Sequence, residues 1–273
     1  MSTLSLNIRT LNLPFRVGAT SYVIEADLLP NAQFLAAYVQ DMQLVLFAVP
    51  DGPSNLPDAP TVAALAAVGR ANDLTYTVHL IEDLAPQHSS AAAASLQKAQ
   101  DVIQRTQALT PWGYVLHLEG RAVRTPDTPA EHLAQWQTEV QASLQQVIEW
   151  VGNPTLLAVE NLEGYPPAFV TPVIAGTTVS RCVDIGHLWL DGHDPLPWLQ
   201  EALARTRVVH LHGLHAGRDH QSVAHMAPAQ LDPVINLLLQ QHYTGVLTLE
   251  VFGEADFWSS LHALHASIAR CRR

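Results

Sequence analysis

The sequence predicts an α/β protein folded as a single (β/α)8 TIM barrel, and three observations lead to this fold class. The chain has 273 residues, close to the roughly 250 that are typical of one such barrel. Short apolar runs alternate with longer stretches rich in Ala, Leu and Gln, which is the rhythm of a parallel sheet covered by helices. Eight short runs follow one another, the number that a closed barrel needs. We therefore expect one domain spanning residues 1–273.

The predicted strands are short runs rich in apolar and β-branched residues. In chain order they are Arg16–Ser21, Gln43–Phe47, Thr75–Leu80, Gly113–Leu118, Thr155–Glu160, Ser180–Asp184, Val208–His212 and Gly245–Glu250.

Helices are expected between these strands, and several of them open with Ser, Thr or Pro, as helix starts often do. They are Thr61–Asn72, Ser89–Thr110, Pro129–Val151, Pro195–Ala204, Pro228–Gln241 and Ala255–Arg270. The segment Val49–Pro60, rich in Pro and Gly, follows the second strand, where a barrel places a loop over its active-site mouth.

Composition and charge exclude several classes of protein. Hydrophobic residues make up 48% of the chain and charged residues 14%, as in a packed globular protein. The formal net charge of −11 argues against a nucleic-acid partner, because such binding depends on basic side chains. Met1–Phe15 lacks the features of a signal peptide, and no run approaches ~18 apolar residues, so we expect a cytoplasmic protein without a membrane partner. The two cysteines are too few for a disulfide framework, and the oligomeric state stays open.

Residues that can bind a metal stand at or near the ends of six consecutive predicted strands. A single histidine on an apolar strand is more often a buried side chain with a hydrogen-bond partner. Six positions together indicate a metal site, because carboxylates with neutral imidazoles suit Zn²⁺ or Mn²⁺ and these strand ends carry the chemistry of a TIM barrel. The residues are His79, His117, Glu160, Asp184, His210 with His212, and Glu250.

Two loops add further candidates. In Asp184-Ile-Gly-His187, we expect Gly186 to let the backbone turn so that both polar side chains face the barrel mouth. The loop after the seventh strand contains four histidines, Asp219 and Arg218 within eleven residues. Arg218 is either a phosphate contact or a solvated loop charge, and His215 and His225 are either part of the site or surface residues.

These residues resemble the xylose isomerase-like TIM barrels and, within them, the endonuclease IV family of metal-dependent phosphodiesterases. The resemblance spans most of the chain and implies up to three metal ions held by successive strand ends, with the carboxylate of the fifth strand bridging two of them. In that family one residue separates the Asp and His of the third set, whereas here these two are adjacent. Carried over by motif, the sets are His79, His117 and Glu160; Glu160, Asp184, His210 and Glu250; and His187, Asp219 and His220.

The first part of the chain resembles more closely the CbiR family of cobamide-remodelling phosphodiesterases. Ala48 departs from the pattern of that family, in which we expect an acidic residue at this position, directly after Leu44–Phe47. The matching segments are Phe15–Ile24, Leu29–Asn31, Leu44–Phe47, Ser54–Asp58 and Leu74–Leu80.

This second resemblance implies hydrolysis of the phosphodiester in the nucleotide loop of a cobamide, cobalamin or a relative, with release of cobinamide for remodelling. The substrate would be this small molecule, and the cofactors two or three divalent ions, Zn²⁺ or Mn²⁺. We expect Glu160, Glu250 and Arg218 to act in catalysis.

Two other functions stay open at this point. A metal-dependent sugar or sugar-phosphate isomerase or epimerase would use Glu160 and Glu250 as acid and base, although such a site needs fewer histidines. Its metal content would be one ion, whereas hydrolysis predicts two or three. A non-catalytic corrinoid-binding or metal-storing protein would bind tightly without turnover.

Overall fold

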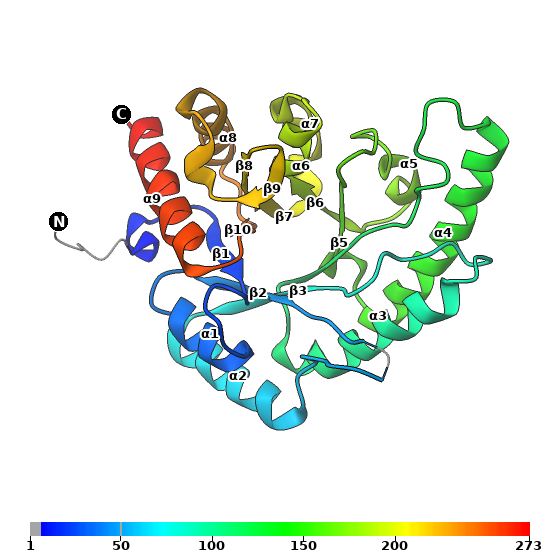
Figure 1. Ribbon diagram of the computed structural model, residues 1–273, viewed down its shortest axis with the longest axis horizontal. Coiled ribbons are helices and arrows are strands. Elements are labelled where there is room, and N and C mark those ends of the chain that lie inside the picture. Colours follow the sequence, from blue (N-terminus) through cyan, green and yellow to red (C-terminus); the bar gives the residue numbers. More distant parts are fainter. Residues whose placement is uncertain (1–6, 50) are drawn as a thin grey trace.

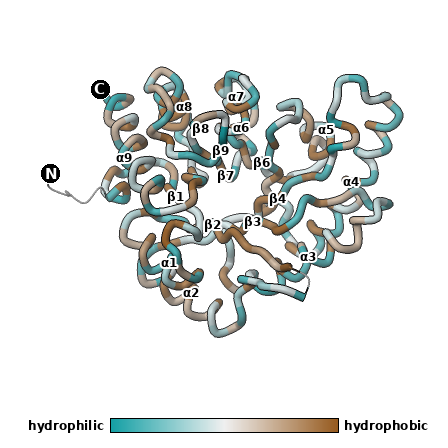
Figure 2. The backbone as a smooth tube through the Cα atoms, viewed as in Figure 1, coloured by the Kyte–Doolittle hydropathy of each residue, from teal (hydrophilic) through white to brown (hydrophobic). Residues whose placement is uncertain are grey.

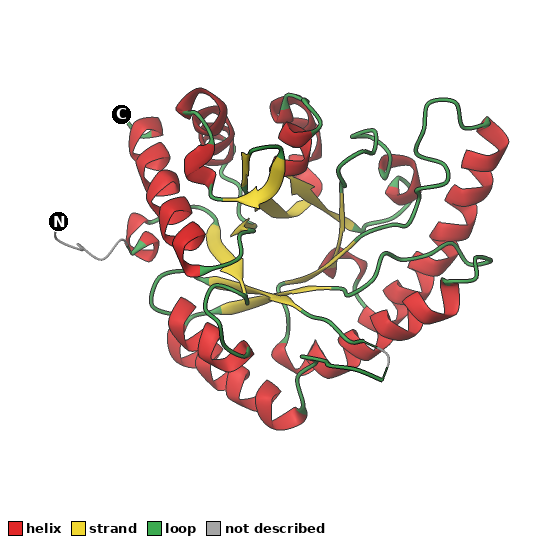
Figure 3. Cartoon of the chain, viewed as in Figure 1, coloured by secondary structure: helices red, strands yellow, loops and turns green. Residues whose placement is uncertain are grey.

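The computed structural model describes residues 7–49 and 51–273, and its strands form a closed parallel barrel in the order β1-β10-β7-β6-β5-β4-β3-β2. The strands lie at the centre of the molecule with helices around them (Figures 1 and 3). The predicted (β/α)8 fold is confirmed. The barrel strands are β1 Arg16–Thr20, β2 Asp41–Val45, β3 Thr75–His79, β4 Gly113–Leu116, β5 Leu157–Glu160, β6 Ser180–Asp184, β7 Thr206–Leu211 and β10 Val246–Leu249.

Local capping explains where several helices begin and end. Asp58 accepts a hydrogen bond from the backbone N–H of Thr61 at the start of α2, and Asp194 caps α7 in the same way. Gly152 ends α4 in the left-handed conformation that glycine adopts without strain. The helices are α1 Leu28–Leu35, α2 Ala59–Asn72, α3 Ala92–Thr106, α4 Ala130–Val151, α5 Thr171–Ile174, α6 Ile185–Leu190, α7 Pro195–Ala202, α8 Pro228–Gln240 and α9 Glu254–Cys271.

The structure also corrects the predicted elements. Helices α1, α5 and α6 were not predicted; α5 and α6 are too short to show a helical period in the sequence. Strand β2 begins at Asp41, two residues before the apolar run, because a buried carboxylate opens it. Strand β5 begins at Leu157, two residues after its predicted start at Thr155, because Pro154–Leu156 forms a 3-10 turn. The loop after β7 contains an antiparallel hairpin of β8 Gly213–His215 and β9 Arg218–Gln221.

The apolar core lies mainly between the barrel and the helices, and the barrel interior holds only a small apolar layer. Val115, Ala158, Cys182 and Val208 form this inner layer, with Trp112 packed against it. Polar side chains occupy the barrel toward the C-terminal strand ends, so burial of apolar surface stabilises the outer layer while the interior positions polar groups. Both cysteines are free thiols.

The loop after β2 carries a short hairpin in which Ala48 pairs with Ser54. Figure 2 shows that the hydrophobic character of β2 continues into this loop. Pro50, in the segment expected to cover the mouth, lies outside the described residues, as do residues 1–6 of the N-terminal segment Met1–Phe15. None of the helices in the described part of the chain is long and apolar enough to cross a lipid bilayer.

Candidate metal centre

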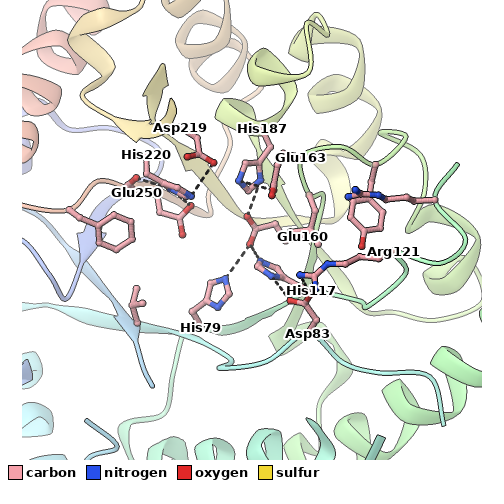
Figure 4. A pocket seen from close by; sticks show the side chains of 15 residues that line it. His79, Asp83, His117, Arg121, Glu160, Glu163, His187, Asp219, His220 and Glu250 are labelled. Atoms are coloured by element: carbon pink, nitrogen blue, oxygen red, sulfur yellow. Dashed lines mark hydrogen bonds and ion pairs between the residues drawn. The ribbon is translucent and has the colours of Figure 1, made fainter. Parts of the chain in front are cut away.

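A cavity of about 310 Å³ opens at the C-terminal ends of the barrel strands, and most of the predicted ligands line it. In Figure 4 the side chain of Glu160 lies at its centre, between His79, His117 and His187. Asp184 and His210 are fully buried and belong to the same cluster of contacts. The predicted ligands among the lining residues are His79, His117, Glu160, His187, Asp219, His220 and Glu250.

The first group of candidate ligands is formed by two histidines that face one carboxylate oxygen. Nε2 of His79 lies 3.4 Å and Nε2 of His117 lies 3.2 Å from Oε2 of Glu160. The other ring nitrogens are already engaged, since Nδ1 of His79 donates to the carbonyl oxygen of Leu80 at 2.8 Å and Nδ1 of His117 donates to Asp83 at 3.1 Å. In the neutral rings both Nε2 lone pairs therefore point toward a negative oxygen, an arrangement that a cation between them would stabilise.

The second group of ligands surrounds Nδ1 of His210. This atom lies 3.0 Å from Oε1 of Glu160, 3.1 Å from Oε2 of Glu250 and 3.7 Å from Oδ2 of Asp184. The ligand atoms of these four residues lie within 4.8 Å of one another. Glu160 thus turns one oxygen toward each group, which is the geometry of a bridging carboxylate.

Gln43 belongs to this site, although it was not among the residues predicted from the sequence. Its Oε1 accepts a hydrogen bond from Nε2 of His210 at 2.7 Å, and its Nε2 donates to Oε1 of Glu250 at 3.0 Å. Gln43 therefore fixes the neutral tautomer of His210 with Nδ1 free, and leaves the other oxygen of Glu250 free as well. A signal was present in the sequence, because Gln is a polar residue within an apolar strand.

The partners of the buried carboxylates test whether these residues fit a metal. Within residues 7–49 and 51–273, Oδ2 of Asp184 and Oε2 of Glu250 are buried without a hydrogen-bond partner. Across the same part of the chain, the ion pairs of Glu160, Asp184 and Glu250 involve only histidines, with no Lys or Arg. Buried carboxylates need a compensating cation, so three of them among histidines fit divalent metal ions.

The pKa shifts express the same electrostatic imbalance. Burial alone would lower the pKa of His117, but the Glu160 and Asp83 carboxylates raise it to about 10. Burial would raise the pKa of Glu160, but the charges of His210 and His117 hold it well below its ordinary value. The carboxylates thus create a negative potential strong enough to hold protons on buried imidazoles, and the same potential favours a metal ion in their place.

Helix α6 positions the side chains of Asp184, its N-cap residue, and His187. It begins directly after β6, and Oδ1 of its N-cap residue Asp184 accepts a hydrogen bond from the backbone N–H of His187 at 2.6 Å. Gly186 has an ordinary helical backbone, so it is not needed for a sharp turn as we expected. It is needed for space, because a Cβ atom there would lie 2.1 Å from the ring of His212.

A third group of possible ligands consists of His187, His212 and His220, and not only the two histidines expected from the sequence. The buried His212 accepts a hydrogen bond at Nδ1 from the backbone N–H of His220 at 3.0 Å, and its Nε2 lies 3.3 Å from Asp184. Its imidazole therefore supports the hairpin loop as well as facing the site.

Asp219 and His220 are adjacent in sequence, and yet both line the cavity. In a regular strand neighbouring side chains point to opposite faces, but His220 has a φ of 47°, which breaks this alternation. Oδ2 of Asp219 consequently lies 3.8 Å from Nε2 of His220. The adjacency that departs from the endonuclease pattern is thus compatible with both residues facing one ion.

Arg218, the phosphate contact expected from the sequence, lies away from the cavity. Arg218 is exposed on β9 and is absent from the residues that line the cavity, which include Arg121 and Arg124 instead. The guanidinium of Arg124 lies 5.0 Å from the ring centroid of Tyr165, and Arg121 lies 3.6 Å from Asp83. These two arginines come from the loop between β4 and α4. They were not predicted from the sequence because they do not lie at the end of an apolar strand.

The remaining histidines of the loop lie on the surface. His215 and His225 are both exposed, and their rings stack with centroids 4.4 Å apart.

Glu163, which was not among the residues predicted from the sequence, lines the cavity with its carboxylate 3.5 Å from Nε2 of His187.

Comparison with known proteins places most of the chain in one family of barrels. The family model described as xylose isomerase-like TIM barrel matches residues 37–271. The crystal structure of a D-tagatose 3-epimerase-like protein is similar with a TM-score of 0.76 at 15% identity, covering 94% of this chain and 98% of that one. Endonuclease IV from Thermus thermophilus has a TM-score of 0.67 at 19% identity, with 93% and 99% covered.

D-psicose 3-epimerase, crystallised in the presence of D-fructose, has a TM-score of 0.67 at 14% identity, with 94% of this chain and 98% of that one covered. No curated protein sequence matches the chain at a significant level. At such identities the similarity to solved structures shows the fold alone.

Proposed function

The chain belongs to the xylose isomerase-like TIM barrel family, and from that premise we propose that it is a metal-dependent phosphodiesterase that hydrolyses the nucleotide loop of cobamides. One observation carries the phosphodiesterase part of this proposal. The carboxylate of Glu160 faces two separate ligand groups, His79 with His117 on one side and His210 on the other.

The residues would hold two ions side by side, and a third where the loop after β7 meets α6. Glu160 would be shared by the first two, Asp184, His210 and Glu250 would complete the second, and His187, His212 and His220, with Asp219 beside His220, would surround the third. Divalent ions in these positions would supply an activated water and neutralise the charge that develops on the phosphate and leaving oxygen.

The chain's own side chains orient this site. Gln43 and Asp83 each accept a hydrogen bond from a candidate ligand histidine, so that the other nitrogen of each ring points into the cavity. Glu250, held by Gln43 through one oxygen, keeps the other for an ion. This fixed arrangement reduces the reorganisation that the reaction would otherwise require.

The phosphate side of the substrate is assigned to the loop between β4 and α4. Arg121 and Arg124 line the cavity, and a guanidinium engages two phosphate oxygens at once. Contact with the ring of Tyr165 holds Arg124 in place, which favours it as the principal contact.

Two observations support a small phosphodiester as the substrate over a nucleic acid. The net charge of −11 disfavours a polyanion, while the local charge of metal ions and two arginines suffices for one phosphate. The first part of the chain resembles the cobamide-remodelling phosphodiesterases. Endonuclease IV is among the similar structures, so a DNA duplex with an abasic site is the competing phosphodiester to assay.

A sugar epimerase or isomerase is the second candidate. Glu160, Asp184, His210 and Glu250 form a self-contained group of four ligands, and two of the similar structures carry the names of sugar epimerases or epimerase-like proteins. In that reaction Glu160 and Glu250 would transfer the proton. His79 and His117 would then have no ligand role, and the metal content would be one ion per chain.

The deciding experiment incubates the purified, metal-loaded protein with a cobamide and follows release of cobinamide by chromatography, with Glu160→Gln as control. Release by the wild type alone, at two or three ions per chain, is the expected result. With metals bound and no cobamide cleaved, the phosphodiesterase proposal fails for this substrate, and the abasic-site duplex and ketose sugars are assayed next.

A further inference from the structure

A second cavity, of about 520 Å³, lies beside the metal cavity. The loop after β1 and the loop after β2 form its walls, with Tyr22 on one loop and Phe47 and Asn55 on the other. Its volume falls within the range of small-molecule binding sites. None of its lining residues belongs to the metal ligand groups, so the proposed chemistry leaves this cavity unexplained.

Asn55 holds the two walls together. Its Oδ1 accepts a hydrogen bond from the backbone N–H of Phe47 at 2.6 Å, and its Nδ2 donates to the hydroxyl of Tyr22 and to the carbonyl of Val45, both at 3.1 Å. All of the polar atoms of its side chain are engaged in joining the loops. The cavity is therefore a preformed feature of the folded chain.

The two cavities are neighbours, because residues that line one contact residues that line the other. Val45, which is bonded to Asn55, lines the metal cavity, and so does Phe252. The ring of Phe252 lies 6.3 Å from that of Tyr22 and 5.6 Å from that of His220, measured between centroids. A ligand with a reacting group at the metal centre and a ring a few bonds away can span both.

Two exposed aromatic rings lie at this boundary. Phe47, 37% exposed, lines the second cavity and Phe252, 44% exposed, lines the metal cavity, whereas Val49, the third exposed large hydrophobic residue within residues 7–49 and 51–273, lines neither. Exposed aromatic rings are unfavourable in water, and their grouping at a cavity marks a binding surface. They are suited to stacking against a planar ring.

The charges of this cavity select against a second phosphate. Its lining residues include Asp27 and Asp58 and no Lys or Arg, whereas the arginines stand around the metal cavity. The hydroxyl of Tyr22 accepts a hydrogen bond from Asn55 and keeps its own proton to donate. The occupant is therefore planar, without negative charge, and suited to carry an acceptor such as a ring nitrogen.

We propose that this second cavity binds the nucleoside half of the substrate, a planar base with its ribose, while the phosphate lies at the metal centre. The assignment rests on the proposed phosphodiesterase function for the identity of the base, and on the geometry for its place. A corrin ring with its amide side chains is larger than this cavity, so it stays at the open mouth. The enzyme then selects cobamides by their lower-ligand base, through Tyr22 and Phe47.

The test measures binding directly, without turnover. The probe is α-ribazole, the nucleoside of 5,6-dimethylbenzimidazole, titrated into the metal-loaded protein and followed by its fluorescence. Phe47→Ala is expected to weaken binding about tenfold by loss of stacking. Ala26→Trp, which places an indole in the cavity, is expected to abolish binding. Val49→Ala is the matched control, because Val49 is exposed on the same hairpin but does not line the cavity.

Metal content and melting temperature, measured for each variant, establish that the fold and the metal centre are intact. Failure of the wild type to bind α-ribazole, or equal binding by Ala26→Trp, overturns the inference. A parallel cobamide assay keeps the two proposals apart. Binding that Ala26→Trp abolishes, without cleavage of any cobamide, supports the cavity and refutes the function, whereas equal cleavage by wild type and Ala26→Trp refutes the cavity alone.

Discussion

The amide oxygen of Gln43 accepts a hydrogen bond from Nε2 of His210 at 2.7 Å, and both side chains are completely buried. Because an amide oxygen only accepts, this bond fixes the proton of the neutral imidazole on Nε2. Nδ1 is then left facing Glu160 and Glu250 at 3.0 and 3.1 Å. A residue outside the ligand set thus determines which nitrogen of His210 is available.

Replacing Gln43 tests this role. We expect Gln43→Met, which keeps the length of the side chain and removes both hydrogen bonds, to weaken metal affinity about 10- to 100-fold. Competition with a chelator measures the affinity, and Gln43→Glu, which restores an acceptor for His210, should recover part of it. Unchanged affinity in Gln43→Met would show that packing alone orients His210.

The position of Glu160 between two groups of candidate ligands predicts that one substitution affects two ions. We expect Glu160→Gln to lose at least two equivalents of metal and all hydrolytic activity, because both ligand groups share this carboxylate. Elemental analysis of the purified protein counts the ions. Glu131→Gln, on an exposed position of α4, is the control. A variant that keeps the metal content and rate of the wild type would rule out the bridge.

The close contact between Gly186 and His212 predicts a specific rescue. A Cβ atom at position 186 would lie 2.1 Å from the imidazole, so Gly186→Ala should destabilise the fold by about 1–3 kcal/mol. His212→Ala removes the imidazole from this contact. In that background Gly186→Ala should therefore destabilise the fold by less than it does in the wild type. Thermal unfolding of the four proteins measures the coupling, and strictly additive effects would contradict the contact.

The arginines of the loop between β4 and α4 predict where a phosphate binds. Arg124→Ala should raise KM for the phosphodiester roughly tenfold or more, since a hydrogen bond to a charged group contributes about 1.5–3 kcal/mol. Arg70→Ala, on an exposed position of α2, serves as the control. Steady-state kinetics of these variants and of Arg218→Ala give the comparison. A larger effect at Arg218 than at Arg124 would return the phosphate contact to the hairpin.

Asp41 predicts an unusual pH dependence of stability. It is fully buried at the start of β2, and desolvation raises its pKa from 3.8 to about 6 despite a hydrogen bond from the hydroxyl of Thr75. Between about pH 4 and 6 the folded protein therefore binds this proton more tightly than the unfolded chain, and the contribution to stability falls as pH rises. Above pH 6 the free energy of unfolding is lower by at most about 3 kcal/mol on account of this group.

Asp41→Asn removes this titration. The variant should be more stable than the wild type above pH 6, and the difference should vanish toward pH 4. Urea unfolding of the metal-free proteins across this range measures it, with the exposed Asp127→Asn as control. A difference that does not change with pH would show that Asp41 stays ionised in the folded state.

The sequence predicted the barrel because apolar periodicity is a local property that eight strands repeat. It also predicted ligand residues at the ends of those strands, since His79, His117, Glu160 and Glu250 each follow an apolar run. It did not predict α1, or the boundary of β2 at Asp41, because a buried carboxylate breaks the apolar pattern that marks a strand.

Only the tertiary structure decided how these side chains meet. Gln43 and His210 are 167 residues apart, and nothing local to either indicates the hydrogen bond between them. The place of Arg124 in the cavity depends on the path of a loop, and the shared direction of Asp219 and His220 depends on a φ of 47° at one residue. The sequence by itself determined the fold and the kinds of residue at the strand ends that could bind a metal, because these follow from local patterns along strands. Closure of the barrel brings distant strands and loops together. It therefore decided which ring nitrogens of the histidines, which carboxylate oxygens and which arginines face the cavity.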